Sequence, residues 1–127
     1  MVAMTNDHPL VAKTCLTVAI LANEPLIFYS ESDADTRLYT ILCRILGNEP
    51  NVAYRTSNTL SVLALAAAGL GLALVPATMM QVAIPGLVYK VLDAPELAAD
   101  LMLISRGEES SGAVLAFLAL ARQEAAL

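Results

Sequence analysis

The stretch from Ser57 to Pro76, SNTLSVLALAAAGLGLALVP, decides the fold. Ser57 or Asn58 can cap a helix, because either side-chain oxygen can accept hydrogen bonds from the free N–H groups of the first turn. Apolar residues then recur at helical spacing, at Leu60, Leu63, Ala67 and Leu70. Gly69 and Gly71 permit the left-handed backbone that ends a helix, and an apolar run follows them. The stretch therefore predicts a helix, a glycine stop and a buried strand closed by Pro76.

Short strands and helices alternate along the rest of the chain as well. The expected strands cover residues 26–29, 52–54, 72–75, 87–92 and 101–105. The expected helices cover residues 38–46, 77–82 and 114–122, and the last one can be capped by Ser110 or Ser111. Strands that alternate with helices are typical of an α/β fold with a doubly wound, mostly parallel sheet.

Composition limits the classes of function. The chain has 127 residues, which suits one domain, and its formal charge is −5 with an isoelectric point near 4.6. Its seven Lys and Arg residues are scattered. Because DNA affinity depends on clustered positive charge, we expect no direct contact with nucleic acid.

The beginning of the chain and its longest uncharged stretch indicate where in the cell the protein is expected. The N-terminus lacks the basic start and apolar core of a signal peptide, so we expect a cytoplasmic protein. Residues 60–80 carry no charge and are long enough to span a bilayer. The two glycines and Pro76 favour a helix followed by a strand over a membrane helix.

The residues that could carry chemistry are dispersed. His8 is the only histidine, no G-x-S-x-G motif occurs, and Cys15 and Cys43 are isolated, which predicts two buried reduced thiols. Asp33 and Asp35 are expected to cap a helix. Gly69-Leu70-Gly71 follows a helix and lacks a third glycine, so it is not a dinucleotide fingerprint. We therefore expect no catalytic residues, no metal and no cofactor.

Several motifs occur in an order that resembles one family. They are His8-Pro9-Leu10, the EPLIF segment at residues 24–28, the stretch of residues 57–76, the PGLVY segment at residues 85–89 and the FLALAR segment at residues 117–122. Together they resemble the effector-binding domain of LysR-type transcriptional regulators. The resemblance implies a periplasmic-binding-protein-like fold of type 2 and no enzymatic activity. It covers only the later part of that domain, without the winged helix-turn-helix and the first part of the effector domain.

The resemblance also implies a division of the chain. Residues 1–24 would lead in from the missing first subdomain, and residues 25–92 would form the second effector-binding subdomain. Residues 93–127 would hold a crossover strand and a terminal helix that pack on the first subdomain in the family. Without that partner, the apolar face of the helix would be exposed, so we expect a homo-oligomer.

Two polar segments follow expected strands and precede expected helices. They contain the candidate ligand-binding residues Ser30, Glu31 and Ser32 in the first segment, and Thr56, Ser57 and Asn58 in the second. In open parallel sheets ligands bind beyond the carboxyl ends of strands, and helix N-termini suit a small carboxylate. Capping alone is the competing interpretation, evenly balanced for Ser57 and favoured for Asn58.

The sequence thus predicts the ligand-sensing portion of a LysR-type regulator, which binds a small-molecule effector, in particular a carboxylate. The alternative is a solute-binding protein or a small α/β enzyme on the same architecture, because a fold alone does not define a function. An enzyme would need a cluster of titratable residues, and an exported solute receptor would need a signal peptide.

Overall fold

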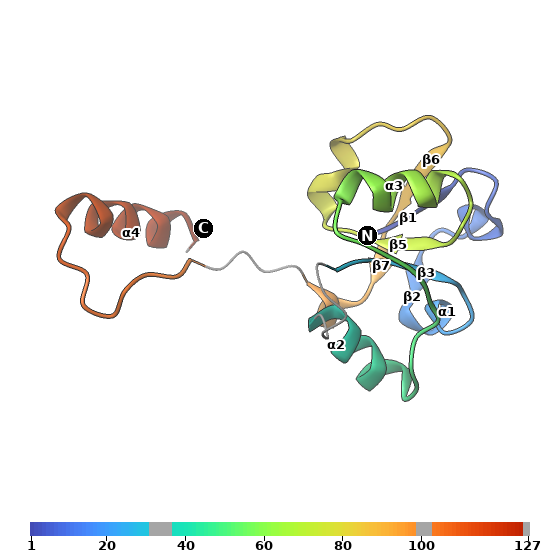
Figure 1. Ribbon diagram of the computed structural model, residues 1–127, viewed down its shortest axis with the longest axis horizontal. Coiled ribbons are helices and arrows are strands. Elements are labelled where there is room, and N and C mark those ends of the chain that lie inside the picture. Colours follow the sequence, from blue (N-terminus) through green and yellow to red (C-terminus); the bar gives the residue numbers. More distant parts are fainter. Residues whose placement is uncertain (31–36, 99–102, 126–127) are drawn as a thin grey trace.

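A five-stranded sheet with the strand order β4-β3-β5-β1-β6 forms the centre of the molecule (Figure 1). The computed structural model of the chain describes residues 1–30, 37–98 and 103–125. The strands of the central sheet are β1 (Val2–Thr5), β3 (Leu26–Tyr29), β4 (Val52–Thr56), β5 (Leu72–Leu74) and β6 (Leu87–Lys90). A second sheet pairs β2 (Leu16–Thr17) with β7 (Leu92–Asp93).

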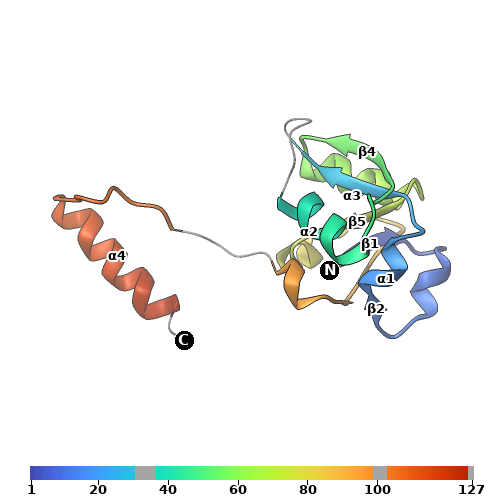
Figure 2. The ribbon, with the colours of Figure 1, turned by 90° about the horizontal axis from the view of Figure 1, so that it is seen from below.

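Helices flank the central sheet. The α-helices are α1 (Val18–Leu21), α2 (Arg37–Leu46), α3 (Thr59–Ala67) and α4 (Gly112–Ala125). Three shorter 3-10 helices are η1 (Pro9–Ala12), η2 (Ala77–Gln81) and η3 (Pro95–Leu97). Helix α3 covers one face of the sheet, and α1 and α2 lie on the opposite face (Figures 1 and 2). The result is a three-layer α/β arrangement.

The strand directions confirm the mostly parallel sheet. Strand β3 pairs in parallel with β4 on one side and with β5 on the other. Strand β1 is antiparallel to both of its neighbours, β5 and β6. The sequence did not predict β1, which lies inside the expected lead-in segment. Its partners, Leu74 and Lys90, are far away in the sequence, so only the folded chain reveals the pairing.

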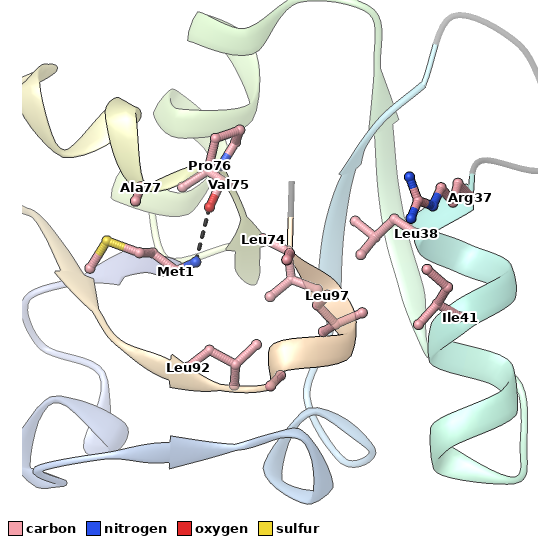
Figure 3. A pocket seen from close by; sticks show the side chains of 12 residues that line it. Met1, Arg37, Leu38, Ile41, Leu74, Val75, Pro76, Ala77, Leu92 and Leu97 are labelled. Carbon is pink, nitrogen blue, oxygen red and sulfur yellow. Dashed lines mark hydrogen bonds between the residues drawn. The ribbon is translucent and has the colours of Figure 1, made fainter. Parts of the chain in front are cut away.

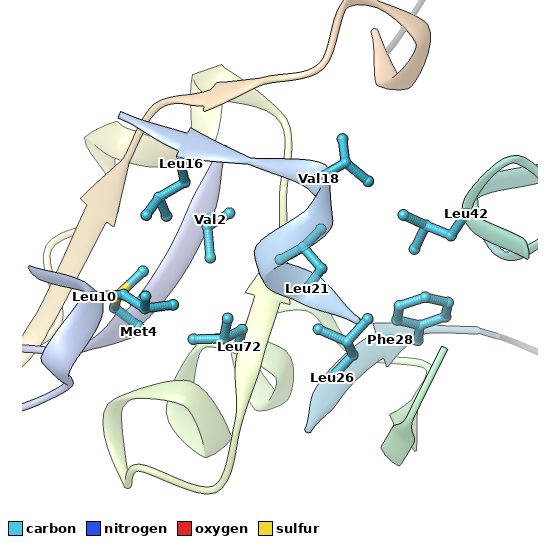
Figure 4. Close-up of a cluster of buried hydrophobic side chains, with 10 residues drawn as sticks. All are labelled: Val2, Met4, Leu10, Leu16, Val18, Leu21, Leu26, Phe28, Leu42 and Leu72. Atoms are coloured by element: carbon cyan, nitrogen blue, oxygen red, sulfur yellow. The ribbon is translucent and has the colours of Figure 1, made fainter. Parts of the chain in front are cut away.

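Alternating side chains divide the core into two clusters. On β3, Leu26 and Phe28 point to the face covered by α1 and α2, whereas Ile27 points to the face covered by α3. The first cluster is the larger one and is drawn in Figure 4. Strands β1 and β5 alternate in the same way, since Ala3 and Ala73 join Ile27 under α3. This period of two is expected for strands that are buried on both faces.

The turn between α3 and β5 depends on Gly71. Its backbone has a φ of +158°, and a Cβ at this position would lie 2.6 Å from the Pro25 carbonyl oxygen. That oxygen accepts a hydrogen bond of 2.8 Å from Leu72 N–H, which begins the pairing of β5 with β3. Gly69, with a φ of +77°, ends α3 as the sequence predicts.

Some expectations for individual elements were wrong. The expected strand over residues 87–92 is interrupted at Val91, which is 60% exposed, and its two parts belong to different sheets. Of the expected strand over residues 101–105, residues 101 and 102 lie outside the described residues, and residues 103–105 form no strand. Leu60 is 61% exposed, because the buried face of α3 consists of Val62, Leu63 and Ala66.

The two cysteines are less buried than the sequence predicts. Cys15 is exposed, so the prediction of a buried thiol was wrong there, and Cys43 is half-buried. Cys15 directly precedes β2, whose buried residue is Leu16, and the alternation of the strand turns its neighbours outward. In the described ranges, no helix is both long and apolar enough to cross a membrane.

Helix α4 lies apart from the layered part of the molecule (Figures 1 and 2). The sequence predicted this helix over residues 114–122, which is confirmed. Its large apolar side chains are nevertheless exposed, among them Val114, Leu115, Phe117 and Leu120. Leu118 is the buried residue of the helix. The described chain therefore presents an apolar helix to its surroundings.

Replacement of Gly71 by alanine tests the close approach of β5 to β3. The added Cβ meets the Pro25 carbonyl oxygen, so we expect Gly71→Ala to lower the free energy of unfolding by about 2–4 kcal/mol. Gly47→Ala is the matched control, because Gly47 also has a positive φ but has open space around it. Its expected loss is about 1 kcal/mol. Urea denaturation measures both, and equal losses would contradict this role of Gly71.

Candidate functional site

The carboxyl ends of three parallel strands meet at one edge of the central sheet. Ser30 follows β3, Thr56 is the last residue of β4, and Val75 follows β5. Because β3 lies between β4 and β5, the three positions are neighbours along this edge. Helix α3 begins shortly after β4, and α2 is the next described element after β3. This is the edge at which open parallel sheets bind their ligands.

Ser30 and Thr56 are held together by the sheet. The Ser30 N–H donates a hydrogen bond of 3.0 Å to the Thr56 carbonyl oxygen, which extends the pairing of β3 with β4. Ser30 is 9% exposed and is the only buried polar residue of the described ranges. Of the other residues predicted in the first polar segment, Glu31 and Ser32 lie outside the described residues.

The second polar segment forms the cap of α3. The Asn58 Oδ1 atom accepts a hydrogen bond of 3.2 Å from Ser61 N–H, so Asn58 is the N-cap. The Thr56 Oγ1 atom accepts a bond of 3.3 Å from Asn58 N–H, which fixes the approach to the cap. Ser57 lies between these residues and is exposed. The expected capping role of Asn58 is therefore confirmed.

A cavity of about 470 Å³ lies at the carboxyl end of β5 (Figure 3). One wall consists of residues 74–77, and the first turn of α2 supplies Arg37, Leu38 and Ile41. The remaining wall comes from Met1 and from the segment of β7 and η3. In Figure 3 the side chains of Leu92 and Leu97 lie across from the α2 residues. Of the six residues predicted from the polar segments, the four that the structure describes, Ser30, Thr56, Ser57 and Asn58, do not line this cavity.

The electrostatics of the cavity depend on one side chain. Arg37 is the only charged side chain among the described lining residues, and the others are apolar. Met1 is paired with Val75 through two backbone hydrogen bonds of 3.0 Å. Burial lowers the pKa of the Met1 amino group, so this amine loses its proton more readily than an exposed one. The guanidinium of Arg37, by contrast, stays protonated and is thus the constant positive charge of the cavity.

Aromatic contacts hold α2 in position beside the sheet. The Arg55 guanidinium carbon on β4 lies 5.4 Å from the centroid of the Tyr39 ring on α2. It also lies 6.0 Å from the ring of Phe28 on β3, and the two rings meet edge to face. Cation–π contacts of this kind are worth about 0.5–1 kcal/mol at exposed sites. They tie the helix that lines the cavity to two strands.

The single histidine has a structural position. The His8 Nδ1 atom accepts a hydrogen bond of 3.2 Å from Leu10 N–H and so caps η1. Its Nε2 atom lies 3.5 Å from a carboxylate oxygen of Glu24. These contacts connect the turn after β1 to the segment before β3. In the part of the chain that the structure describes, no group of three or more His, Cys, Asp or Glu residues could hold a metal ion.

The sequence predicts a site at the correct edge of the sheet but does not predict the cavity. The predicted residues are polar and follow β3 and β4, whereas the cavity wall after β5 is the apolar run Val75-Pro76-Ala77. The same rule about carboxyl ends of strands applies to β5, so Pro76 was the available signal. The contribution of Leu92 and Leu97 depends on the pairing of β7 with β2, which has no local signature.

Comparisons with known proteins agree with this geometry. The LysR substrate binding domain family matches residues 1–126. The HTH-type transcriptional regulator AlsR of Bacillus subtilis (strain 168) is 24% identical over 118 residues, which are 91% of this chain and 39% of AlsR. The BenM effector-binding domain with its effector benzoate is 26% identical with a TM-score of 0.77, over 99% of this chain and 59% of that chain.

One further structure shows the fold alone. CbnR, a LysR family transcriptional regulator, is 21% identical with a TM-score of 0.62, over 76% of this chain and 34% of that chain. The chain therefore has the α/β fold of the effector-binding part of such regulators. It belongs to the LysR substrate-binding domain family. The chain spans 39% and 34% of the lengths of two curated relatives that it matches.

These findings favour one of the two functional classes that the sequence left open. AlsR and CbnR are transcriptional regulators, and the BenM domain binds an effector, so the alternative of a solute-binding protein or an enzyme is not favoured. The predicted periplasmic-binding-protein-like architecture of type 2 is confirmed.

Replacement of Asn58 and Ser57 separates capping from other roles at the second polar segment. Asn58→Ala removes the acceptor for Ser61 N–H, so we expect the free energy of unfolding to fall by about 1 kcal/mol. Ser57→Ala at the exposed neighbouring position is the control, with an expected change within about 0.5 kcal/mol. Both are measured by urea denaturation. A larger loss for Ser57→Ala than for Asn58→Ala would contradict the cap assignment.

Proposed function

We propose that this chain is the ligand-sensing portion of a LysR-type transcriptional regulator, and that a small-molecule effector binds at the carboxyl edge of its sheet. The observation that carries the proposal is the cavity of about 470 Å³ at that edge, in a chain of this family. Its size suits a small ligand, since ligand sites commonly measure about 300–1,000 Å³. In this role the chain acts as a sensor and not as an enzyme.

The effector acts by favouring one arrangement of the regulator over another. A ligand shifts such an equilibrium only by its difference in affinity for the two states. Residues 25–92 would form the second effector subdomain and one wall of the site, and a first subdomain would supply the other wall. The share of the BenM effector-binding domain that this chain covers, 59%, supports this division.

The effector is a small carboxylate under this proposal. The helix N-termini at the edge and the guanidinium of Arg37 favour an anion. The structure of BenM with benzoate is a precedent for a carboxylate in a related domain. Ser30, Ser32, Thr56, Ser57 and Asn58 remain candidates for contact with the carboxylate. Glu31 does not match an anion and would instead favour an amine or hydroxyl group of the effector.

The terminal helix has a partner in the complete regulator. Residues 93–127 would cross to the first subdomain, and α4 would pack there with its exposed residues Val114, Phe117 and Leu120. The match of the BenM domain over 99% of this chain includes this helix and supports the assignment. DNA is not contacted by this chain, whose formal charge is −5. The place of action is the cytoplasm.

Thermal unfolding with a panel of small carboxylates and amino acids tests the sensing function. A ligand at about one hundred times its dissociation constant adds roughly 2.7 kcal/mol of stability. For a domain of this size the melting temperature should rise by roughly 5 to 15 °C. The purified 127-residue chain is used, and Ser57→Leu reports on a contact of Ser57 with the ligand. A cooperative melt that no compound of the panel shifts would refute binding by this chain.

Self-association tests the exposed helix. We expect the weight-average mass of the chain in sedimentation equilibrium to rise with concentration, because exposed apolar patches drive association. The double variant Phe117→Glu and Leu120→Glu places two charges on the exposed apolar surface of α4 and should weaken association by about tenfold or more. The charge-matched control is Ser111→Glu with Gln123→Glu. A monomer at all concentrations would contradict the expected homo-oligomer.

A further inference from the structure

We infer that the cavity beside β5 and α2 selects a monocarboxylate with an apolar body, whose carboxylate is held by Arg37. This inference rests on the proposed sensing function and narrows its ligand class. It separates such acids from dicarboxylates, from amino acids and from neutral compounds of the same shape. It also assigns the apolar body of the ligand to the cavity and the main charged contact to Arg37, with the polar segments after β3 and β4 as neighbours at the same edge.

The walls of the cavity select the body of the ligand. Leu38 and Ile41 on α2 lie across from Leu92 and Leu97 (Figure 3). These four side chains are half-buried. Leu38, Leu92 and Leu97 also pack against the first core cluster, so the floor of the cavity is continuous with the hydrophobic core. A ligand with a polar body would give up its hydrogen bonds to water here without finding new partners. A hydrocarbon body has no hydrogen bonds to water to lose, and its removal from water is favourable.

The single charge selects the acidic group. Arg37 is the first residue of α2, a helix of 10 residues, so its side chain and the positive end of the helix lie on the same side of the cavity. A guanidinium carries five N–H donors in a planar fork, which can bind both oxygens of a carboxylate and still hold another acceptor. Apart from Arg37, the lining side chains that the structure describes are apolar, so among them a second carboxylate on the ligand finds no charged partner. The described part of the cavity therefore matches a ligand with one acidic group better than a ligand with two.

The experiment compares three probes of similar size on the full 127-residue chain. Phenylacetate has an apolar body and one carboxylate, phenylacetamide is its neutral counterpart, and succinate has two carboxylates without an apolar body. Dissociation constants are measured by titration in ligand-observed NMR. We expect phenylacetate to bind about tenfold or more tightly than either of the other two, because one charged, bidentate contact or one buried ring is worth at least that factor.

Two variants and one control locate the site. Arg37→Gln should reduce phenylacetate affinity about tenfold and leave phenylacetamide unchanged, because only the charged contact is lost. Ala98→Leu at the exposed rim of the cavity should reduce binding of both aromatic probes. Arg44→Gln removes the same charge from an exposed position of α2 outside the cavity and should change neither. Thermal melts confirm that each variant folds.

Each outcome decides the inference. Equal affinity for phenylacetate and phenylacetamide, or equal effects of Arg37→Gln and Arg44→Gln, would overturn it. Binding of succinate or an amino acid that Ala98→Leu does not weaken would also overturn it, while the proposed sensing function would stand. If no compound of any class binds the chain, the sensing function itself fails together with this inference.

Discussion

The hydrogen bond from Leu72 N–H to the Pro25 carbonyl oxygen, 2.8 Å long, is the contact on which the arrangement of the site depends. It starts the parallel pairing of β5 with β3 and exists because Gly71 has no Cβ to strike that oxygen. With β3 also paired to β4, three strands end at one edge. The cavity after β5 and the polar segments after β3 and β4 are neighbours as a result. A bulkier residue at position 71 would separate the walls of the site before any ligand contact changed.

The core reinforces this edge from both faces of the sheet. Period-two alternation sends Leu26 and Phe28 toward α2 and Ile27 toward α3, so both helices are anchored to the same strand. Both helices also begin at the edge that holds the cavity. Their first turns are therefore positioned by burial of apolar side chains, which contributes about 1.5–3 kcal/mol for each large residue. The packing of the core, rather than polar contacts within the site, therefore holds the site in position.

Local patterns in the sequence were sufficient for much of this arrangement. The cap at Asn58, the stop at Gly69 and the strand over residues 26–29 follow from side-chain chemistry within a few positions, and all three are confirmed. Strand β1 and the break at Val91 were missed, because both depend on partners seventy or more residues away along the chain. The polar residues after β3 and β4 also gave no indication of Pro76, which lines the cavity among apolar residues.

The cavity and α4 have the same physical origin. Both present apolar side chains that the described chain does not cover: Leu38 and Leu97 are half-buried in the cavity, while Phe117 on α4 is 58% exposed. Such surfaces need partners, because exposed apolar patches drive association. The two surfaces differ in charge, however. Arg37 gives the cavity a match for a small acid, whereas the apolar residues 113–121 of α4 offer only packing. Under the proposed function, a small acid therefore occupies the cavity, and another protein surface covers the helix.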